Sequence, residues 1–323
     1  MKEQPVVSLS LDLDDKWTYL KTHGDAGWSD YPSYLSYAVP RILEFLARRD
    51  IRITFFVVGR DATDERNRAV LRMLSQAGHE IANHSFEHDP WLHLYSKEQL
   101  HAELERAEQA IGEATGAAVE GFRGPGFSTS AATLEVLRER DYRFDATAFP
   151  NLLNPLARAY FLARSDLDED ELERRKGLFG SHTDAFRPVK PYQWELDGGR
   201  LLELPVTTMP VFRIPIHFSY LLYLGGYSSR LALAYLRFAL GMCRVTGTEP
   251  SLLLHPLDFL GADDEPELAF FPAMSMNHRE KIAMMERFFD TITSRFRPVV
   301  MGEHVGRFEG RADLPLLQPR FRQ

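Results

Sequence analysis

The sequence predicts an α/β fold in which a parallel sheet curls into a barrel. Between residues 6 and 146, buried strands, loops and amphipathic helices follow one another in a repeated order without hairpin signals, which is typical of a parallel sheet. Chemically active residues come directly after several of these strands, where α/β barrels carry their active sites. With 323 residues, of which 44% are hydrophobic, the chain can form one large domain with an insertion or two smaller ones.

The composition excludes several classes of protein. A formal net charge of −8 argues against a nucleic-acid binder, because neutralising phosphates needs a basic surface. The single cysteine, Cys243, rules out an internal disulfide and a cysteine-based zinc cluster, which leaves His, Asp and Glu as metal ligands. The first residues lack the long apolar core of a secretory signal, so we predict a cytoplasmic protein. The apolar stretch Ile214–Ser229 falls short of the roughly 20 apolar residues that a membrane-spanning helix needs.

An alternating strand is predicted over Val6–Leu11, and the acidic cluster Asp12-Leu13-Asp14-Asp15 follows it directly. If the strand continues, Asp12 and Asp14 share one face, whereas Asp14 and Asp15 point to opposite sides. A turn or a helix cap is the alternative, because short acidic clusters also form these structures. The residues alone leave both interpretations open.

Three further units of strand and helix follow. The capping box Ser96-Lys97-Glu98-Gln99 opens the longest of the predicted helices, and Gly116 is its expected stop. Helices are predicted over residues 34–49, 69–77, 96–114 and 131–139, and strands over residues 51–58, 80–82, 119–122 and 142–146.

His84 and His88 stand at the end of the strand that begins at Glu80. Spaced four residues apart, they are one helical turn from each other, so both rings can face one point. Neutral imidazole is the commonest protein ligand of metal ions, and this pair needs only one anionic ligand to make a catalytic site with an open position. A chance pair on a solvated helix face is the alternative.

The pattern changes after residue 150. Residues 151–194 combine a strongly charged run with a stretch rich in Gly, Pro, Ser and His, and we interpret them as an insertion over the barrel. A strand is predicted over Leu201–Pro205. The apolar stretch Phe218–Val245 is interpreted as a buried pair of helices, with a lipid-receiving surface as the alternative. The buried strand Ser251–Leu254 is followed by His255 at its rim. A helix over residues 281–295 and a strand over residues 298–301 complete the predicted elements.

Four sequence blocks stand at these strand ends: SLSLDLDD, HSFEH, FRGPGF and LLLHPLDF. In this order they resemble the polysaccharide deacetylase family, also called the NodB-homology or carbohydrate esterase family 4 group. The resemblance covers residues 6–148 and 201–301. It implies a distorted, incomplete (β/α) TIM-like barrel of the NodB type, forming a single domain over residues 1–305, with an insertion at about 151–194 and a C-terminal tail over 306–323.

The resemblance also implies a divalent metal ion, usually zinc, bound by one Asp and two His. The family pattern has two adjacent aspartates, whereas Leu13 separates Asp12 from Asp14 here. Two registers are therefore open: base Asp12 with ligand Asp14, or base Asp14 with ligand Asp15. We prefer the first, because Asp12 directly follows the strand and shares a face with Asp14. Carried over by position, the expected residues are the metal ligands Asp14, His84 and His88, the base Asp12, its orienting Arg123 and the general acid His255.

The function that the resemblance implies is hydrolysis of an N-acyl group, acetyl or formyl, from an amino sugar, a glycoconjugate or a lipid-linked sugar. A cyclic-amide hydrolase of the allantoinase type is one alternative, and a non-catalytic carbohydrate-binding barrel is another. The expected partner is the acylated substrate, with no nucleic acid and no transmembrane segment. A lipid-linked substrate would add a peripheral membrane contact through Phe218–Val245. The oligomeric state, the exact sugar and the physiological metal are not predicted.

Overall fold

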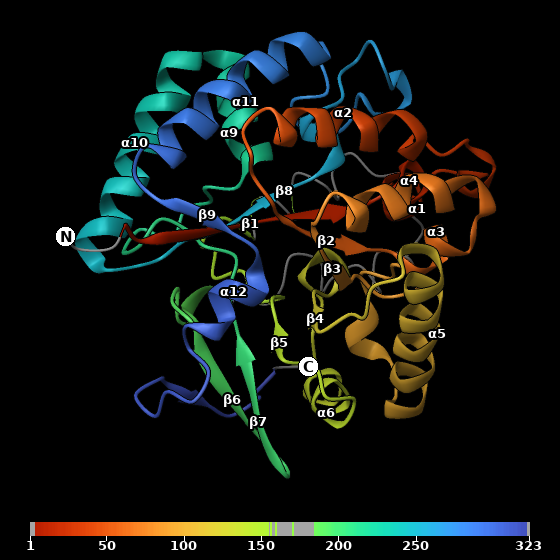
Figure 1. The fold of residues 1–323 in the computed structure, drawn as a ribbon, viewed down its shortest axis with the longest axis vertical. Coiled ribbons are helices and arrows are strands. Elements are labelled where there is room, and N and C mark those ends of the chain that lie inside the picture. Colours follow the sequence, from red (N-terminus) through yellow and green to blue (C-terminus); the bar gives the residue numbers. More distant parts are fainter. Residues whose placement is uncertain (1–3, 155, 157–158, 160–169, 171–183, 322–323) are drawn as a thin grey trace.

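The computed structural model describes residues 4–154, 156, 159, 170 and 184–321. Its centre is a ten-stranded, mostly parallel sheet that curves into a distorted barrel (Figure 1). The order across the sheet is β10 (Leu316–Leu317), β6 (Tyr192–Leu196), β7 (Gly199–Glu203), β5 (Phe144–Asp145), β4 (Gly121–Phe122), β3 (Glu80–Asn83), β2 (Thr54–Val57), β1 (Val6–Leu13) and β8 (Ser251–Leu254), and β9 (Arg297–Val299) also pairs with β1.

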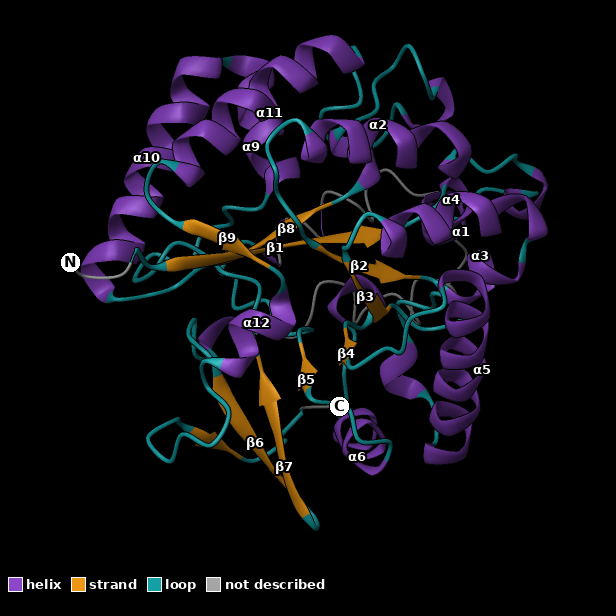
Figure 2. Ribbon diagram, viewed as in Figure 1, coloured by secondary structure: helices purple, strands orange, loops and turns teal. Residues whose placement is uncertain are grey.

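Helices cover the outer face of the sheet (Figure 2), and several of them are strongly amphipathic. The largest apolar cluster joins the outward side chains of β1, among them Leu9 and Leu11, to helix residues such as Ile42 and Phe289. The helices are α1 (Lys16–His23), α2 (Leu35–Ala47), α3 (Gly59–Thr63), α4 (Glu65–Gln76), α5 (Lys97–Thr115), α6 (Ala131–Glu139), α9 (Phe218–Tyr227), α10 (Ser229–Thr246), α11 (His278–Thr293) and α12 (Met301–Gly306).

Strand β1 alternates between the helix layer and the barrel interior. Its leucines pack against helices, whereas Ser8, Ser10 and Asp12 are buried on the opposite face. There Ser10 and Asp12 accept hydrogen bonds from Arg123. The alternation therefore separates core residues from the polar residues of the barrel interior.

The barrel closes through the segment that follows β7. The amide of Leu204 donates to the Asp145 carbonyl (2.9 Å), which continues the pairing with β5. Three residues later, the Thr207 amide donates to the Ser251 carbonyl of β8 (2.8 Å). The short segment 204–207 thus links β5 to β8 and closes the barrel without forming a full strand.

Several predicted elements are confirmed with shifted ends. Helix α5 carries the capping box at Ser96 and stops at Gly116, and α6 has the predicted bounds. Strand β1 continues through Leu13, two residues further than predicted, so Asp12 lies inside the strand. The expectation of a helical turn between His84 and His88 is wrong, because this stretch is a loop with left-handed backbone at Ser85 (φ 63°) and His88 (φ 51°).

The hairpin of β6 and β7 was not predicted. These strands pair antiparallel across the turn at Asp197-Gly198, a dipeptide that strongly favours tight hairpins. Strand β6 begins inside the stretch interpreted as an insertion, most of which lies outside the described residues. The predicted C-terminal tail contributes β10, which pairs with β6.

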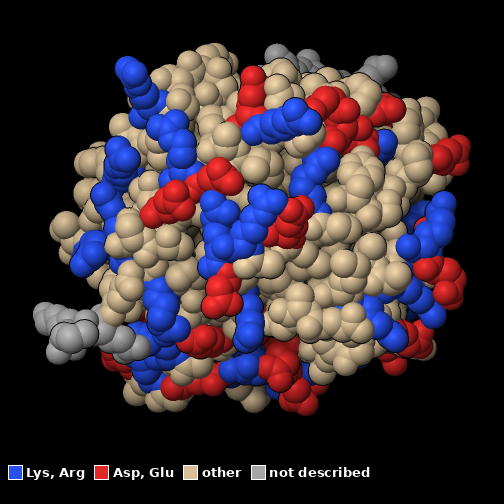
Figure 3. All heavy atoms as spheres, turned by 45° about the horizontal axis from the view of Figure 1, so that its top comes forward, with Lys and Arg blue, Asp and Glu red and all other residues tan. Residues whose placement is uncertain are grey.

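The apolar stretch Phe218–Val245 forms the adjoining helices α9 and α10. Their inner faces are buried in the main core, as the interpretation of a buried helix pair predicts. None of the described helices is long and apolar enough to cross a membrane. On the face drawn in Figure 3, acidic and basic side chains are interspersed and form no continuous surface of one charge.

Candidate metal centre and catalytic site

The parallel register of the sheet gathers the candidate residues at one edge. Leu13 is in register with Val57 of β2, and Val57 with Asn83 of β3. Asn83 is in turn in register with Phe122 of β4. Asp14 follows Leu13, His84 follows Asn83 and Arg123 follows Phe122 in the chain. These three residues therefore lie next to one another at the carboxyl ends of their strands.

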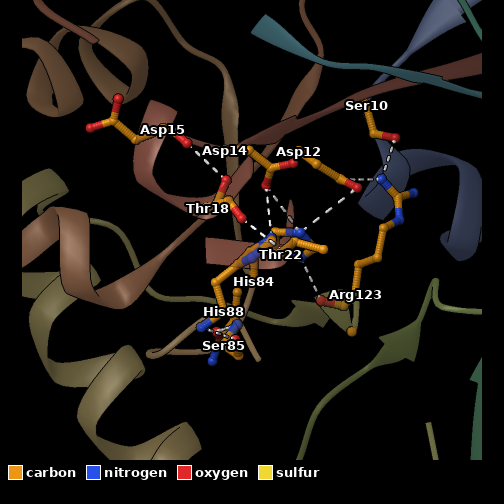
Figure 4. A network of polar contacts seen from close by, with 12 residues as sticks. Ser10, Asp12, Asp14, Asp15, Thr18, Thr22, His84, Ser85, His88 and Arg123 are labelled. Atoms are coloured by element: carbon orange, nitrogen blue, oxygen red, sulfur yellow. Dashed lines mark hydrogen bonds and ion pairs between the residues drawn. The ribbon is translucent and has the colours of Figure 1, made fainter. Parts of the chain in front are cut away.

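Asp14, His84 and His88 converge on one point (Figure 4). Asp14 Oδ1 lies 3.4 Å from His84 Nε2 and 3.1 Å from His88 Nε2. All three side chains are buried. Burial by itself raises the pKa of the Asp14 carboxyl, but the adjacent imidazoles of His88 and His84 outweigh it, so the net pKa lies below the usual range.

The loop that carries His88 is held by buried hydrogen bonds. Glu103 Oε1 on α5 accepts from the amides of Phe86 (2.8 Å) and Glu87 (2.7 Å). The His88 amide donates to Ser85 Oγ (3.2 Å). The loop geometry, rather than helical spacing, thus brings the second imidazole beside the first.

The donor atoms of this trio fit a divalent metal ion. His84 Nδ1 lies 2.6 Å from the Arg123 carbonyl, which fixes the tautomer and leaves Nε2 as a lone-pair donor. Asp14 Oδ1 and both ring nitrogens of His88 are buried and make no hydrogen bond with good geometry. Asp14 Oδ1 nevertheless lies close to Nε2 of both imidazoles, as the ligands of one metal ion would. Such orphaned buried atoms are costly unless they have another partner, and two His and one Asp are a ligand set that suits zinc.

Asp12 lies beside the trio and is held by Arg123. Arg123 Nη1 donates to Asp12 Oδ1 (2.6 Å) and to Ser10 Oγ (3.0 Å). Its Nε donates to the Ala146 carbonyl (3.0 Å), and the guanidinium lies 4.2 Å from the centre of the Phe56 ring. The other oxygen of Asp12, Oδ2, lies 3.9 Å from His84 Nε2 and faces the trio.

Asp15 has a different role, because it caps helix α1. Its Oδ1 accepts from the amides of Lys16 (2.7 Å) and Tyr34 (3.1 Å). Figure 4 shows its carboxylate pointing away from the two imidazoles. Of the two registers left open by the sequence, the geometry favours Asp12 and Asp14.

His255 follows β8 on the neighbouring side of β1. Leu254 of β8 is in register with Leu11 of β1. One residue further along each strand, His255 therefore lies beside Asp12. His255 Nδ1 lies 3.1 Å from Ser219 Oγ, which in turn donates to Asp258 Oδ1 (2.7 Å). Because the Ser219 hydroxyl donates to the carboxylate, it accepts from Nδ1, and Nε2 is the nitrogen left for proton transfer.

Ser219 and Asp258 were not singled out from the sequence. Asp258 stands three residues after His255, and its Oδ2 accepts from the His255 amide (2.8 Å), a spacing that resembles a capping box. Ser219 lies within the first turn of α9, 36 residues before His255, and no local pattern connects them. Only the folded chain brings them together.

Comparisons with known proteins show which sequences and folds this chain is similar to. The sequence profile described as "Polysaccharide deacetylase" matches residues 21–144, which include His84, His88 and Arg123. A crystal structure of a Mycobacterium smegmatis protein, provisionally described as a polysaccharide deacetylase, superimposes with a TM-score of 0.65 at 20% identity, covering 100% of this chain and 97% of that one. Over residues 21–144 the chain is therefore similar to the polysaccharide deacetylase family. Its fold is the NodB-type barrel of that family.

Two curated relatives carry more specific descriptions. The peptidoglycan deacetylase of Helicobacter pylori is 25% identical over 162 residues, which cover 48% of this chain and 53% of that protein. The chitooligosaccharide deacetylase of Sinorhizobium fredii is 33% identical over 100 residues, which cover 29% of this chain and 45% of that protein. The chain thus spans about half the length of these relatives.

Proposed function

We propose that this protein is a metal-dependent hydrolase that removes an N-acyl group, acetyl or formyl, from an amino sugar or a glycoconjugate. The observation that carries the proposal is the convergence of Asp14, His84 and His88, with orphaned ligand atoms, beside the Asp12–Arg123 pair. The names of the two curated relatives support N-acetylated sugars as the substrate class.

In this proposal, Asp14, His84 and His88 hold the metal ion, for which we propose zinc. A divalent ion at such ligands supplies Lewis acidity that polarises a carbonyl oxygen and lowers the pKa of water. The fixed tautomer of His84 keeps its Nε2 available as a ligand.

Asp12 acts as the general base of the proposed reaction. Arg123 donates to one carboxylate oxygen and keeps the group oriented, while Oδ2 faces the trio and accepts the proton of the attacking water. Arg123 can do this because its guanidinium is fully buried and held by Ser10, Ala146 and Phe56.

His255 acts as the general acid. Expulsion of an amine from an amide needs a proton on nitrogen, because an amide anion is a poor leaving group. The chain from His255 through Ser219 to the buried Asp258 holds the imidazole with Nδ1 as a donor, so Nε2 delivers that proton. Base and acid then come from the neighbouring strands β1 and β8.

The proposal is tested with the purified full chain by metal analysis and by acetate release from N-acetylglucosamine oligomers. We expect about one bound divalent ion, activity that chelator abolishes and zinc restores, and loss of both in His84→Ala and His88→Ala. Stoichiometric metal retained in both variants would overturn the assignment. Metal binding with turnover of a cyclic amide, but of no N-acyl sugar, would favour the allantoinase-type alternative.

A lipid-linked substrate is a second candidate, because helices α9 and α10 expose apolar side chains. Leu231 (55% exposed) and Phe238 (54%) lie two turns apart on α10, and Tyr227 (75%) ends α9. Co-sedimentation with anionic vesicles, lost in Leu231→Glu and Phe238→Glu, would support peripheral membrane contact. Equal recovery of all three proteins in the supernatant would exclude it.

A further inference from the structure

A hollow lies far from the candidate metal centre. It has a volume of about 570 Å³, within the range of small-molecule sites. Pro5 lines it at the amino end of β1, whereas Asp14 follows the carboxyl end of that strand. The eight residues of β1 separate the two, and the nine steps from Pro5 to Asp14 span about 30 Å at about 3.3 Å per residue. No residue of the trio lines the hollow, so it is a separate site.

The hollow carries an excess of positive charge. Its lining contains four cationic side chains and two carboxylates, in a chain whose formal net charge is −8. A local reversal of sign in a concave surface concentrates anions there. The cationic residues are Lys190, Arg244, Arg307 and Arg311, and the carboxylates are Glu249 and Asp313.

Two of the arginines are paired within the hollow. Arg307 contacts both oxygens of Glu249 (3.2 and 3.3 Å), and Arg311 contacts both oxygens of Asp313 (2.9 and 2.6 Å). Glu249 also accepts from the Val6 amide (3.1 Å), which ties this wall to β1. These contacts hold both guanidinium groups in place and leave the charge of the remaining two cations uncompensated.

Arg244 and Lys190 supply that charge. Lys190 Nζ donates to the Thr246 carbonyl (2.6 Å) at the end of α10, a neutral partner. Arg244, two residues earlier on α10, has no carboxylate within ion-pair distance among residues 4–154 and 184–321. Both are exposed at the rim, so an anion can reach them without displacing an existing ion pair.

The floor of the hollow is apolar. Cys243 and Phe296 are fully buried there, and Phe308 is half-buried beneath Arg311, whose guanidinium lies 5.5 Å from the ring centre. Behind the Glu249 wall, His304 is fully buried, and its Nε2, without a hydrogen-bond partner, lies 3.9 Å from Glu249 Oε2. A ligand suited to this arrangement joins an anionic group to a ring or another apolar part.

We infer that this hollow binds a phosphate ester, with the phosphate between Arg244 and Lys190 and the organic part over Phe308. Arginine and lysine are the residues that bind phosphate oxygens most directly, and a phosphate dianion matches the excess of two positive charges. The inference is independent of the proposed hydrolysis.

Isothermal titration calorimetry of the full chain tests the inference, with phenyl phosphate and inorganic phosphate as probes. We expect saturable, one-to-one binding of phenyl phosphate that is about tenfold tighter than that of inorganic phosphate. Arg244→Gln should weaken it at least tenfold, whereas Arg244→Lys should retain part of the affinity. The matched control is Arg237→Gln, an exposed arginine two turns earlier on α10 that does not line the hollow and should leave the affinity unchanged.

Three outcomes would overturn the inference. The first is absence of saturable binding at millimolar concentration. The second is an equal loss in Arg244→Gln and Arg237→Gln, which would indicate non-specific attraction of anions. The third is loss of phenyl phosphate binding in His84→Ala, which would assign the anion to the metal centre. Unchanged thermal unfolding of Arg244→Gln would show that a loss of binding does not reflect misfolding.

Discussion

The described residues contain two groups of Asp and His that could each gather around a metal ion, and they differ in how their atoms are partnered. One is the buried trio Asp14, His84 and His88. The other is the more exposed group Asp263, Asp264 and His278. In the second group, both oxygens of Asp263 accept from His278, at 2.9 Å from the amide and 2.7 Å from Nδ1.

The Asp264 carboxylate also accepts hydrogen bonds from neighbouring residues. It accepts from both terminal nitrogens of Arg41 (2.6 and 2.9 Å) and from the Gly261 amide (3.0 Å). This second group is a clasp that fastens the start of α11 to α2. The comparison teaches that residue types alone do not identify a metal centre, because buried ligand atoms without hydrogen-bond donors distinguish the first group from the second.

The largest effect should come from removing a ligand in each group. We expect His88→Ala to lose the bound metal and to lower kcat by at least roughly 10³-fold, because a site with two ligands left cannot hold the ion in place. Asp264→Asn should keep both metal content and activity. Elemental analysis and acetate release check this, and loss of metal in Asp264→Asn alone would reverse the comparison.

Asp12→Asn should separate catalysis from metal binding. We expect full metal content with kcat lowered roughly 10²- to 10⁴-fold, the range of a missing general base. The variant keeps the shape of the side chain and a partner for Arg123. If the metal is lost as well, Asp12 is a ligand and the assigned register is wrong.

His255→Ala should depend on the leaving group. Amide hydrolysis should fall roughly 10²- to 10⁴-fold, because the departing amine needs a proton. Hydrolysis of an aryl acetate should fall far less, since a phenolate departs without one. Equal losses for both substrates would assign His255 to substrate binding instead.

Lys21 should affect the metal centre through its neighbours. Its Nζ donates to the Glu87 carbonyl (2.8 Å) and forms an ion pair with Asp89 (2.6 Å). Lys21 thus contacts the residues on both sides of His88. We expect Lys21→Met to weaken zinc binding roughly 10- to 100-fold, as loss of a supporting contact does, and Lys21→Arg to restore part of it. Competition with a chromogenic chelator measures this affinity.

Arg41→Met is the matched control for Lys21→Met. Arg41 supports Asp264 in the clasp as Lys21 supports the His88 loop. It should lower thermal stability and leave zinc affinity unchanged. An equal fall in zinc affinity in both variants would mean that the effect is global rather than local.

The smallest effect concerns the pH dependence of stability near the clasp. Burial lowers the pKa of Lys281 on α11 from 10.5 to about 8. The unfolded chain therefore keeps this proton to higher pH than the folded chain, so the group contributes increasing stability between about pH 8 and pH 10.5. Denaturant unfolding should show this rise in the native protein and a smaller one in Lys281→Met. An identical slope in both would contradict the assignment.

Parts of the site could be predicted because they depend on local sequence. The alternation of β1 from Ser8 to Asp12 predicts which side chains face the barrel interior, and the end of a parallel strand predicts the edge where His84 lies. The bounds of β1 were too short because Asp12 breaks the usual strand composition, whereas burial and the partner Arg123 stabilise it there.

Other parts could not be predicted, because they depend on contacts between distant segments. The sequence left Asp15 open as a ligand, whereas in the fold its Oδ1 accepts from the Lys16 amide at the start of α1 and from the Tyr34 amide, 19 residues away. The β6–β7 hairpin carried a turn signal at Asp197-Gly198, yet the irregular composition before it concealed the strand.

The sequence by itself determined the barrel class and the candidate residues that follow its strands, because periodicity and motif blocks are properties of neighbouring residues. The tertiary structure decided which atoms meet. It alone left Asp14 Oδ1 and the His88 nitrogens without hydrogen-bond donors while it gave every oxygen of Asp263 a partner. That difference arises from burial and from the loop backbone at His88, which no spacing in the chain encodes.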